Sequence, residues 1–285
     1  TLFYGVLERR LTLDYAVSRF SKLRLSALSP KVLEILRLGA YQILFLDRVP
    51  DSAAVNESVE LAKRQGEARA SGFVNGVLRS LLRGRESLSW PNDSIRYSCP
   101  EWLIDLWRTS YGKKLTDSLL ESLSEPAPVY IRVNTYRTNR DSLMELLREE
   151  GVASRAAELS PGALILEKPG SLSSLRTFQD GLFHVQDLSS QLAASALGAA
   201  AGERVIDVCS APGGKAFTIA EEMQNSGELL AFDKYKGKVR LIAAGAERLG
   251  LTIVKAALRD AEAPKEPLAP ADRVLCDAPC SGLGI

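Results

Sequence analysis

Hydrophobic residues recur with different periods in different parts of the chain. Over residues 1–85 they return at every third or fourth position, which is typical of helices that each bury one face. From Arg204 onward, short apolar runs of strand length alternate with segments of helical period. The first pattern predicts an all-helical bundle, and the second predicts a parallel sheet joined by helices.

Helix starts can be read directly from the N-terminal part of the chain. Ser29 and Pro30 predict one, because serine caps free backbone N–H groups and proline fits the first helical position. The apolar positions from Val32 to Leu44 are numerous enough for a central, heavily buried helix. A second helix is expected to open at Pro50, and a last one to cover residues 73–82. Together they predict a compact bundle.

The middle of the chain predicts a linker and a small α+β module. Residues 86–100 are rich in Ser, Pro, Asn and Asp, as linkers are. A helix is expected from Pro100, and its large apolar side chains are expected in a core rather than on a base-stacking platform: Trp102, Leu103, Leu106 and Trp107. The aromatic ones among them would pack at a seam between domains. The module would then contain a strand over 128–135, a helix over 141–150, and strands near 163–166 and 182–185.

Three polar residues of this module have more than one interpretation. Arg132 and Asn134 lie on the same face of their predicted strand, where either RNA contact or a structural role is compatible with the pattern. His184 is the only histidine of the chain. We expect it to be a structural hydrogen-bonding residue rather than a catalytic one, because it stands alone beside a strand.

The last part of the chain predicts a Rossmann-like α/β domain. Its four predicted strands are RVIDVC (204–209), ELLAFD (228–233), LTIVKAA (251–257) and DRVLCD (272–277), with helices between them. We therefore divide the chain into residues 1–88 (helical bundle), 89–185 (linker and α+β module) and 186–285 (α/β domain). Ligands of such sheets bind outside the carboxyl ends of the strands.

The turn after the first of these strands, residues 209–215 (CSAPGGK), predicts a nucleotide-like ligand. A phosphate-binding loop would require Ser or Thr where Ala216 stands, and a dinucleotide fingerprint would require another glycine near Gly213 and Gly214. S-adenosylmethionine has no phosphate and needs only an acid at the end of the next strand to hold its ribose. Asp233 supplies that acid, so the methyl donor fits best.

Two further strand ends carry chemically useful side chains. Asp260 follows the third strand and is placed to accept the adenine amino group, and Asp277 ends the fourth strand close to Cys280. Any one of these acids is compatible with a turn or a cap, but acids at successive strand ends indicate a ligand site. A thiol there suggests methylation of cytosine, because thiolate addition at C6 makes C5 nucleophilic.

Composition narrows the class of protein. Of 285 residues, 46% are hydrophobic and 25% charged, as in ordinary soluble globular proteins, and no apolar run approaches the length of a membrane span. Four cysteines without a C-x-x-C pair predict free thiols and no metal site. We expect a cytoplasmic protein that binds neither a membrane nor a metal.

Charge is distributed unevenly along the chain. Residues 1–90 carry 14 Lys and Arg against 9 Asp and Glu, whereas residues 186–285 carry 11 against 13. A basic N-terminal module is compatible with RNA binding, and equally with a merely solvated helical surface.

The two strand-end motifs resemble a known family. DVCSAPGGK (207–215) together with DAPCSG (277–282) resembles the RNA cytosine-5 methyltransferases. RLGAYQILFLDRVPDSAAVNESVELAK (37–63) followed by GFVNGVLR (72–79) resembles the NusB-type RNA-binding bundle. With FHVQDLSSQ (183–191) between them, the combination is similar to the bacterial small-subunit ribosomal RNA cytosine-5 methyltransferases of the Sun/Fmu (RsmB) family.

The resemblance implies a role for each motif residue. The S-adenosylmethionine pocket would be lined by Cys209, Ser210, Ala211, Pro212, Gly213, Gly214 and Lys215. Asp233 would hold the ribose, Asp260 the adenine, and Asp277 would lie near the methionine end and the target base. Cys280 would help to release the methylated product rather than attack the base.

The attacking cysteine of this family lies in a T-C motif further along than this sequence reaches. We therefore expect the nucleophile beyond Ile285, and a C-terminally incomplete methyltransferase domain within a longer protein. The expected activity is methyl transfer from S-adenosylmethionine to C5 of a cytosine in small-subunit ribosomal RNA, by a monomer. The alternative is a non-catalytic RNA-binding protein with a vestigial methyltransferase fold. DNA cytosine methylation is disfavoured by the N-terminal bundle and the A-P-G-G turn.

Overall fold

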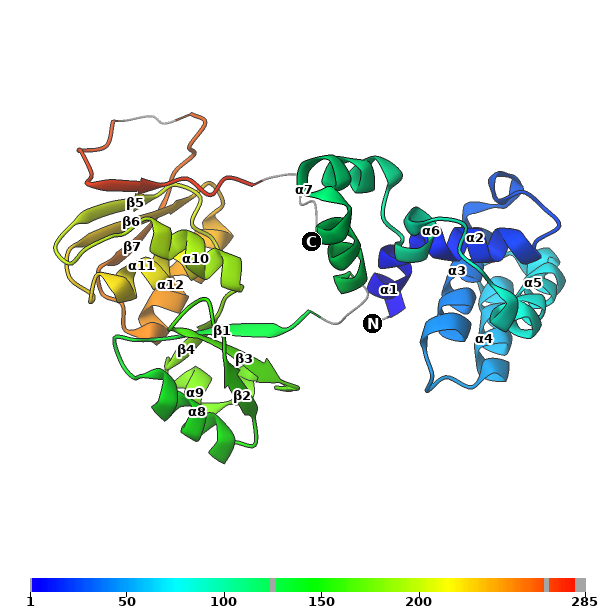
Figure 1. The fold of residues 1–285 in the computed structure, drawn as a ribbon, viewed down its shortest axis with the longest axis horizontal. Coiled ribbons are helices and arrows are strands. Elements are labelled where there is room, and N and C mark those ends of the chain that lie inside the picture. The colour runs from blue at the N-terminus through cyan, green and yellow to red at the C-terminus, as the bar shows by residue number, and fades with distance from the viewer. Residues whose placement is uncertain (1, 124–126, 264–266, 280–285) are drawn as a thin grey trace. The chain divides into compact units, whose positions relative to one another are not determined.

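The computed structural model describes residues 2–123, 127–263 and 267–279. By their internal contacts these form two units, Thr1–Pro126 and Ala127–Ile285 (Figure 1). The boundary between the units falls inside the segment 89–185 that the sequence pattern treats as one piece. Each unit is described by itself.

The first unit is entirely helical, as predicted. Its first five helices are α1 (Leu2–Glu8), α2 (Arg10–Phe20), α3 (Pro30–Phe45), α4 (Asp51–Arg64) and α5 (Ser71–Gly84), with short 3₁₀ helices at Leu25–Ala27, Ala68–Ala70 and Arg85–Ser87. The Ser29 hydroxyl accepts the Val32 N–H at 3.2 Å and Pro30 occupies the first turn, which confirms the predicted start of α3. The core holds fully buried side chains from α2, α3 and α5, among them Leu13, Leu36 and Leu78.

The segment 86–100 is more structured than a linker. It contains α6 (Asp93–Tyr97), whose Ile95 carbonyl accepts the Thr12 hydroxyl at 2.5 Å, and the Ser98 hydroxyl accepts the Leu11 N–H at 2.9 Å. These bonds attach α6 to α2. The Ser, Pro, Asn and Asp residues of this segment are typical of linkers, but here its backbone and side chains form hydrogen bonds with the bundle.

Helix α7 (Glu101–Ser122) is interrupted at Gly112, where φ is 76°. Leu103 is buried and Trp107 is half-buried, as predicted, but Trp102 and Leu106 are 59% and 48% exposed. The prediction that all four are core residues is wrong for Trp102 and Leu106, and the predicted seam between domains stays a prediction. At 100° per residue the four side chains form one stripe, with Trp102 and Leu106 on one side of it and Leu103 and Trp107 on the other, and only the second side is packed in the core of this unit.

The second unit begins with an antiparallel sheet whose strand order is β2-β3-β1-β4. Its elements are β1 (Val129–Val133), α8 (Arg140–Glu149), β2 (Ala153–Ala156), β3 (Ala163–Glu167), a 3₁₀ turn at Leu172–Ser174, α9 (Arg176–Gln179) and β4 (Phe183–Val185). Leu143 and Leu147 of α8 pack with Ile131, Val133 and Phe183 in one core. The pattern predicted this module except for β2, which is short and alternates polar with small residues.

The same unit continues as a parallel sheet with the order β7-β6-β5-β8. Its elements are α10 (Leu188–Ala196), β5 (Arg204–Asp207), α11 (Gly214–Glu222), β6 (Glu228–Asp233), α12 (Lys236–Leu249), β7 (Val254–Leu258) and β8 (Arg273–Leu275). The chain crosses from β5 to β6 to β7 in one direction, so right-handed crossovers place α11 and α12 on the same face. Phe217, Ile219 and Ile242 bury that face against Val205 and Leu229.

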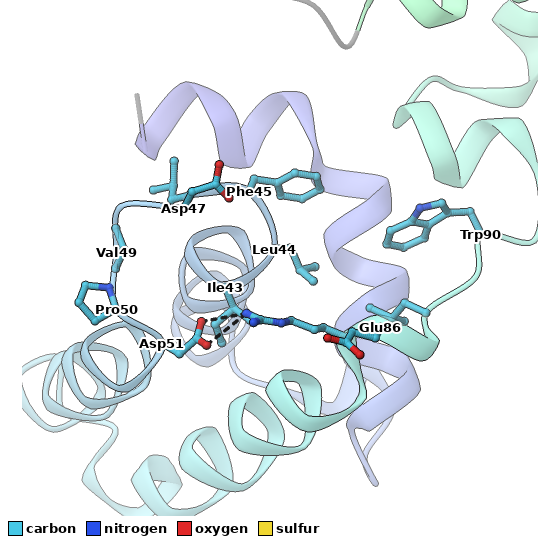
Figure 2. A pocket seen from close by; sticks show the side chains of 12 residues that line it. Ile43, Leu44, Phe45, Asp47, Val49, Pro50, Asp51, Glu86 and Trp90 are labelled. Carbon is cyan, nitrogen blue, oxygen red and sulfur yellow. Dashed lines mark hydrogen bonds and ion pairs between the residues drawn. The ribbon is translucent and has the colours of Figure 1, made fainter.

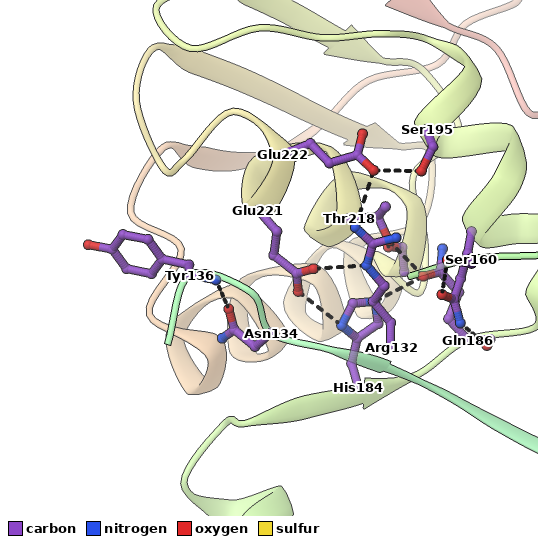
Figure 3. A network of polar contacts seen from close by, with 12 residues as sticks. Arg132, Asn134, Tyr136, Ser160, His184, Gln186, Ser195, Thr218, Glu221 and Glu222 are labelled. Atoms are coloured by element: carbon purple, nitrogen blue, oxygen red, sulfur yellow. Dashed lines mark hydrogen bonds and ion pairs between the residues drawn. The ribbon is translucent and has the colours of Figure 1, made fainter. Parts of the chain in front are cut away.

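Polar side chains join the two sheets (Figure 3). Arg132 is buried and binds Glu221 and Glu222 of α11, each at 3.2 Å. The Asn134 amide donates to the carbonyls of Gly181 and Leu249, at 2.8 and 2.9 Å. Of the two interpretations of this strand face, the structural one is correct. His184 is likewise buried, with its ring nitrogens 3.1 Å from Gln186 and 3.4 Å from Glu221.

Candidate active site

The candidate site lies where β5 gives way to α11. The intervening turn places Gly213 at φ 113°, in the left-handed region where a side chain is strained. A Cβ atom there would also lie 2.3 Å from the Phe217 ring. The Ser210 N–H donates to the Phe232 carbonyl at 2.8 Å and fixes the turn to β6. Glycine is thus required at this turn by both backbone conformation and space.

A cavity of about 300 Å³ opens beside this turn. It is lined by two segments and one strand end: Val185, Gln186, Asp187 and Ser190; Asp207, Cys209, Ser210, Ala211, Pro212, Gly214 and Lys215; and Asp277. Seven of these residues were predicted site residues from the turn and the last strand. The structure therefore brings the CSAPGGK turn and Asp277 together, as expected for the carboxyl edge of a parallel sheet.

Asp207 is a site residue that the sequence reasoning missed. Its side chain is buried, and neither carboxylate oxygen forms a hydrogen bond of regular geometry with a described residue. Burial raises the pKa of Asp207 from 3.8 to about 6, although the nearby Ser210 hydroxyl, the Cys209 N–H and the positive charge of Lys215 act in the opposite direction. A lone acid inside an otherwise apolar strand was the available signal. An unpaired buried carboxylate at a cavity indicates a cationic or hydrogen-donating ligand.

Residues of the segment 185–190 form another part of the cavity lining. The Gln186 oxygen accepts the Thr218 hydroxyl at 2.6 Å, while its buried amide nitrogen has no partner among the described residues. Asp187 caps α10 by accepting the Ser190 N–H at 3.4 Å. These residues come from the FHVQDLSSQ motif, whose run of polar residues between a strand and a helix was the signal for them.

Lys215 and Asp277, which both line the cavity, form an ion pair. The ammonium donates to Asp277 Oδ2 at 2.5 Å and lies 3.4 Å from the Ser190 hydroxyl. Lys215 is mostly buried and Asp277 is exposed. The pair links the turn after β5 to the end of β8 and holds one acid close to the cavity.

Asp233 and Asp260 lie outside this cavity, at the ends of the two neighbouring strands. Asp233 ends β6; it is nearly buried, and its Oδ1 accepts the Tyr235 N–H at 3.0 Å. Asp260 follows β7, is half-buried, and accepts the Glu262 N–H at 3.0 Å. Since β5, β6 and β7 are adjacent, Asp207, Asp233 and Asp260 follow one edge of the sheet in order.

The polar groups along this edge of the sheet fit S-adenosylmethionine. The buried Asp207 carboxylate and the Ser210 hydroxyl form no hydrogen bond of regular geometry, and they lie beside a turn that admits no side chain at Gly213. Asp233 keeps one carboxylate oxygen free of short hydrogen bonds, with only the Lys238 ammonium at 4.0 Å. Carboxylates suit an ammonium group and ribose hydroxyls, and no cluster of basic side chains suited to a phosphate lines the described cavity.

Two of the three described cysteines are unsuited to form a reactive thiolate, whereas the third, Cys276, is exposed next to Asp277. Cys99 is buried in the helical unit, and burial raises its pKa. Burial, and the negative charges around it, raise the pKa of Cys209 as well. Cys280 lies outside the described residues. In the described part of the chain, no group of three His, Cys, Asp or Glu side chains could hold a metal ion, and no helix is long and apolar enough to cross a bilayer.

Comparison with known families matches all three parts of the chain. Residues 1–83 match the NusB family, residues 99–173 match the ferredoxin-like domain of RsmF/B-like methyltransferases, and residues 194–285 match the 16S rRNA methyltransferase family RsmB/F. The helical unit thus contains a NusB domain, and the antiparallel sheet belongs to a ferredoxin-like module. The α/β domain is an S-adenosylmethionine-dependent methyltransferase domain.

Similar proteins extend over the full chain. A Bacillus subtilis protein described as a probable ribosomal RNA small subunit methyltransferase B is 39% identical over 100% of this chain and 65% of its own length. A Synechocystis protein of the same description is 37% identical over 99% of this chain and 66% of its own length. This chain therefore spans just under two thirds of these relatives.

Solved structures agree with the fold. The crystal structure of PH0851 covers 98% of this chain and 64% of its own, with a TM-score of 0.79 and 26% identity. A methyltransferase homologue from Pyrococcus horikoshii covers 57% of this chain and 53% of its own, with a TM-score of 0.52 and 28% identity.

Proposed function

Because the chain belongs to the RsmB/F family of methyltransferases, we propose that its protein transfers a methyl group from S-adenosylmethionine to C5 of a cytosine in small-subunit ribosomal RNA. The observation that carries this proposal is the unpartnered, buried carboxylate of Asp207 at the cavity beside the glycine turn. A buried charge without a partner is costly, so a cationic ligand group accounts for its place there.

We assign the cofactor contacts along the sheet edge. Asp207 would accept the ammonium of the methionine moiety, and the backbone of residues 209–215 would approach that moiety closely. Asp233 would accept the ribose hydroxyls through its unoccupied oxygen, and Asp260 would accept the adenine amino group. When bound, the cofactor supplies an electrophilic methyl group on a sulfonium.

The chain's own residues would orient and enclose the reacting groups. The ion pair of Lys215 with Asp277 forms part of the cavity lining on the side of β8, where the target base would enter. Gln186 and Ser210 offer buried polar atoms without partners to whatever occupies the cavity. The base has to be unstacked before its C5 and C6 atoms can reach this site, so an unpaired stretch of RNA is the expected substrate.

The proposed chemistry needs a thiolate that adds to C6 of the cytosine, after which C5 takes the methyl group. A base then removes the C5 proton, and elimination of the thiol restores the aromatic ring. Cys99 and Cys209 are unsuited to the attack, because burial raises both pKa values. By the family resemblance we place the attacking cysteine beyond Ile285 and assign product release to Cys280.

The test is transfer of labelled methyl groups to unmodified small-subunit ribosomal RNA, with this chain and its full-length parent side by side. Label on cytosine C5 with the parent alone would support both the activity and the position of the nucleophile. Label with this chain alone would refute that position. Absence of label with either protein, despite cofactor and RNA binding, would favour a non-catalytic RNA-binding protein.

A further inference from the structure

The largest of the described cavities lies in the helical unit, whereas the candidate active site belongs to the second unit. It has a volume of about 680 Å³ and opens at the end of α3 (Figure 2). Its walls are the last turn of α3, the turn of residues 46–50, the start of α4 and residues 85–90. We call it the α3-end cavity.

Apolar side chains form much of this cavity. Ile43 is buried, while Leu44, Phe45, Leu88 and Trp90 are half-buried and line the space together with Val49. The Trp90 ring meets Tyr15 edge to face, with centroids 6.0 Å apart, which fixes its place at the wall. A cavity of this size with aromatic and aliphatic walls can accept apolar side chains of a ligand.

The rim is acidic, although the first 90 residues have a net positive charge. Asp47 and Glu86 line the cavity and form no ion pair with any described residue. Asp51 is neutralised by Arg85, whose guanidinium lies 3.0 and 3.2 Å from its two oxygens. Two carboxylates therefore remain without a counter-charge on the lining.

The end of α3 adds to this negative potential. The carbonyls of Ile43, Leu44 and Phe45 accept no hydrogen bond from the described residues, so the helix presents its partially negative end to the cavity. Two cations lie near but do not line it: Arg48 is exposed, and the Arg9 guanidinium sits 5.4 Å from the centroid of the Phe45 ring.

From this combination we propose that the α3-end cavity binds an extended segment of a partner protein in which basic side chains alternate with apolar ones. The basic side chains would pair with Asp47, Glu86 and the helix carbonyls, and the apolar ones would enter between Leu44, Leu88 and Trp90. A nucleic acid does not fit this surface, because its phosphates would meet two unpaired carboxylates. The helical bundle, although its net charge is positive, would thus offer an acidic surface that binds a protein.

A synthetic peptide, acetyl-RLRLRLR-amide, provides the probe. The protein is the 285-residue chain with Trp102→Phe and Trp107→Phe, which leaves Trp90 as the only tryptophan. Titration should change the Trp90 fluorescence and give a dissociation constant that rises with salt. The matched peptide with Glu in place of Arg should not bind.

Variants of the rim decide whether the binding is at this site. The double variant Asp47→Asn/Glu86→Gln should weaken peptide binding about tenfold, since two charge-assisted contacts are lost. The control Glu57→Gln removes an exposed acid on α4 that does not line the cavity, and should change nothing. Both rim residues are exposed, and unchanged thermal unfolding would show that the double variant folds.

Three results would overturn the proposal. The first is equal binding of the basic and acidic peptides. The second is weakened binding of a 16S ribosomal RNA fragment to the double variant with the peptide affinity intact, which would make the cavity an RNA site. The third is a shift of the monomer–dimer equilibrium in the double variant, measured by sedimentation, while its peptide affinity stays unchanged. This result would make the occupant of the cavity a second copy of the chain.

Discussion

The Arg132 guanidinium of β1 and the Glu221 carboxylate of α11 form a buried ion pair, with Nε and Oε2 3.2 Å apart. Their side chains are 6% and 0% exposed. Arg132 also binds Glu222, whose carboxylate accepts the Ser195 hydroxyl at 2.5 Å (Figure 3). The pair thus connects the ferredoxin-like module to the helix that begins at the cofactor turn.

Removing this arginine should destabilise the second unit. Arg132→Met leaves the Glu221 carboxylate buried without its counter-charge, at a cost of about 3–5 kcal/mol in the free energy of unfolding. Urea denaturation measures that cost. The double variant Arg132→Met/Glu221→Gln removes the orphaned charge and should recover part of the loss. If the double variant were as unstable as the sum of the single variants, the pair would not be coupled.

Gly213→Ala should distort the cofactor turn. Alanine at φ 113° is strained, and its Cβ would overlap the Phe217 ring, so we expect a loss of about 1–3 kcal/mol in stability and weaker binding of S-adenosylmethionine. Gly237→Ala is the matched control: it lies within α12 and its Cβ would meet nothing within 4 Å, so stability should stay equal or rise. Calorimetry with the cofactor and thermal unfolding measure both effects. Equal behaviour of the two variants would contradict the role of the turn.

Asp207 should make stability depend on pH in the absence of cofactor. Its folded-state pKa is raised from 3.8 to about 6, so between these values the folded state binds more protons than the unfolded state. The free energy of unfolding should therefore fall as pH rises from about 4 to 6, by about 3 kcal/mol in total. Asp207→Asn should abolish this contribution and be more stable than the parent at pH 8.

The same substitution should also abolish tight binding of S-adenosylmethionine, because the proposed partner of the ammonium is lost. In the unsubstituted chain, affinity should weaken as pH falls through 6 and the carboxylate is neutralised. Denaturation and calorimetry at pH 5 and pH 8 test the two effects. A variant with the parent's pH dependence, or with the parent's affinity, would contradict the assignment.

Asp233→Ala should weaken S-adenosylmethionine binding by about 1.5–3 kcal/mol, or roughly 10- to 150-fold, since a charged acceptor of the ribose hydroxyls is removed. Calorimetric titration measures the change. Asp141→Ala, at an exposed carboxylate in the first turn of α8, serves as the control and should bind as the parent does. Unchanged affinity of the Asp233 variant would refute the ribose contact.

Interactions between residues close in sequence determined many of the helices and strands of this protein and the order of its strand-end acids. The start of α3 follows from Ser29 and Pro30, because capping and a fixed φ act between neighbouring residues. The parallel sheet follows from strand-length apolar runs separated by helical periods, and its carboxyl edge then collects Asp233, Asp260 and Asp277. Motifs 207–215 and 277–282 carry the family resemblance by their residues alone.

Only the tertiary structure decided which side chains face one another across long sequence distances. Arg132 was compatible with RNA contact until the fold placed Glu221, 89 residues away, against it. Trp102 and Leu106 looked like core residues, yet no described element covers them. Asp207 gained its raised pKa from burial, and the acidic α3-end cavity came from residues on separate helices. Hydrophobicity and charge are properties of single residues, whereas burial and pairing depend on what the folded chain brings into contact.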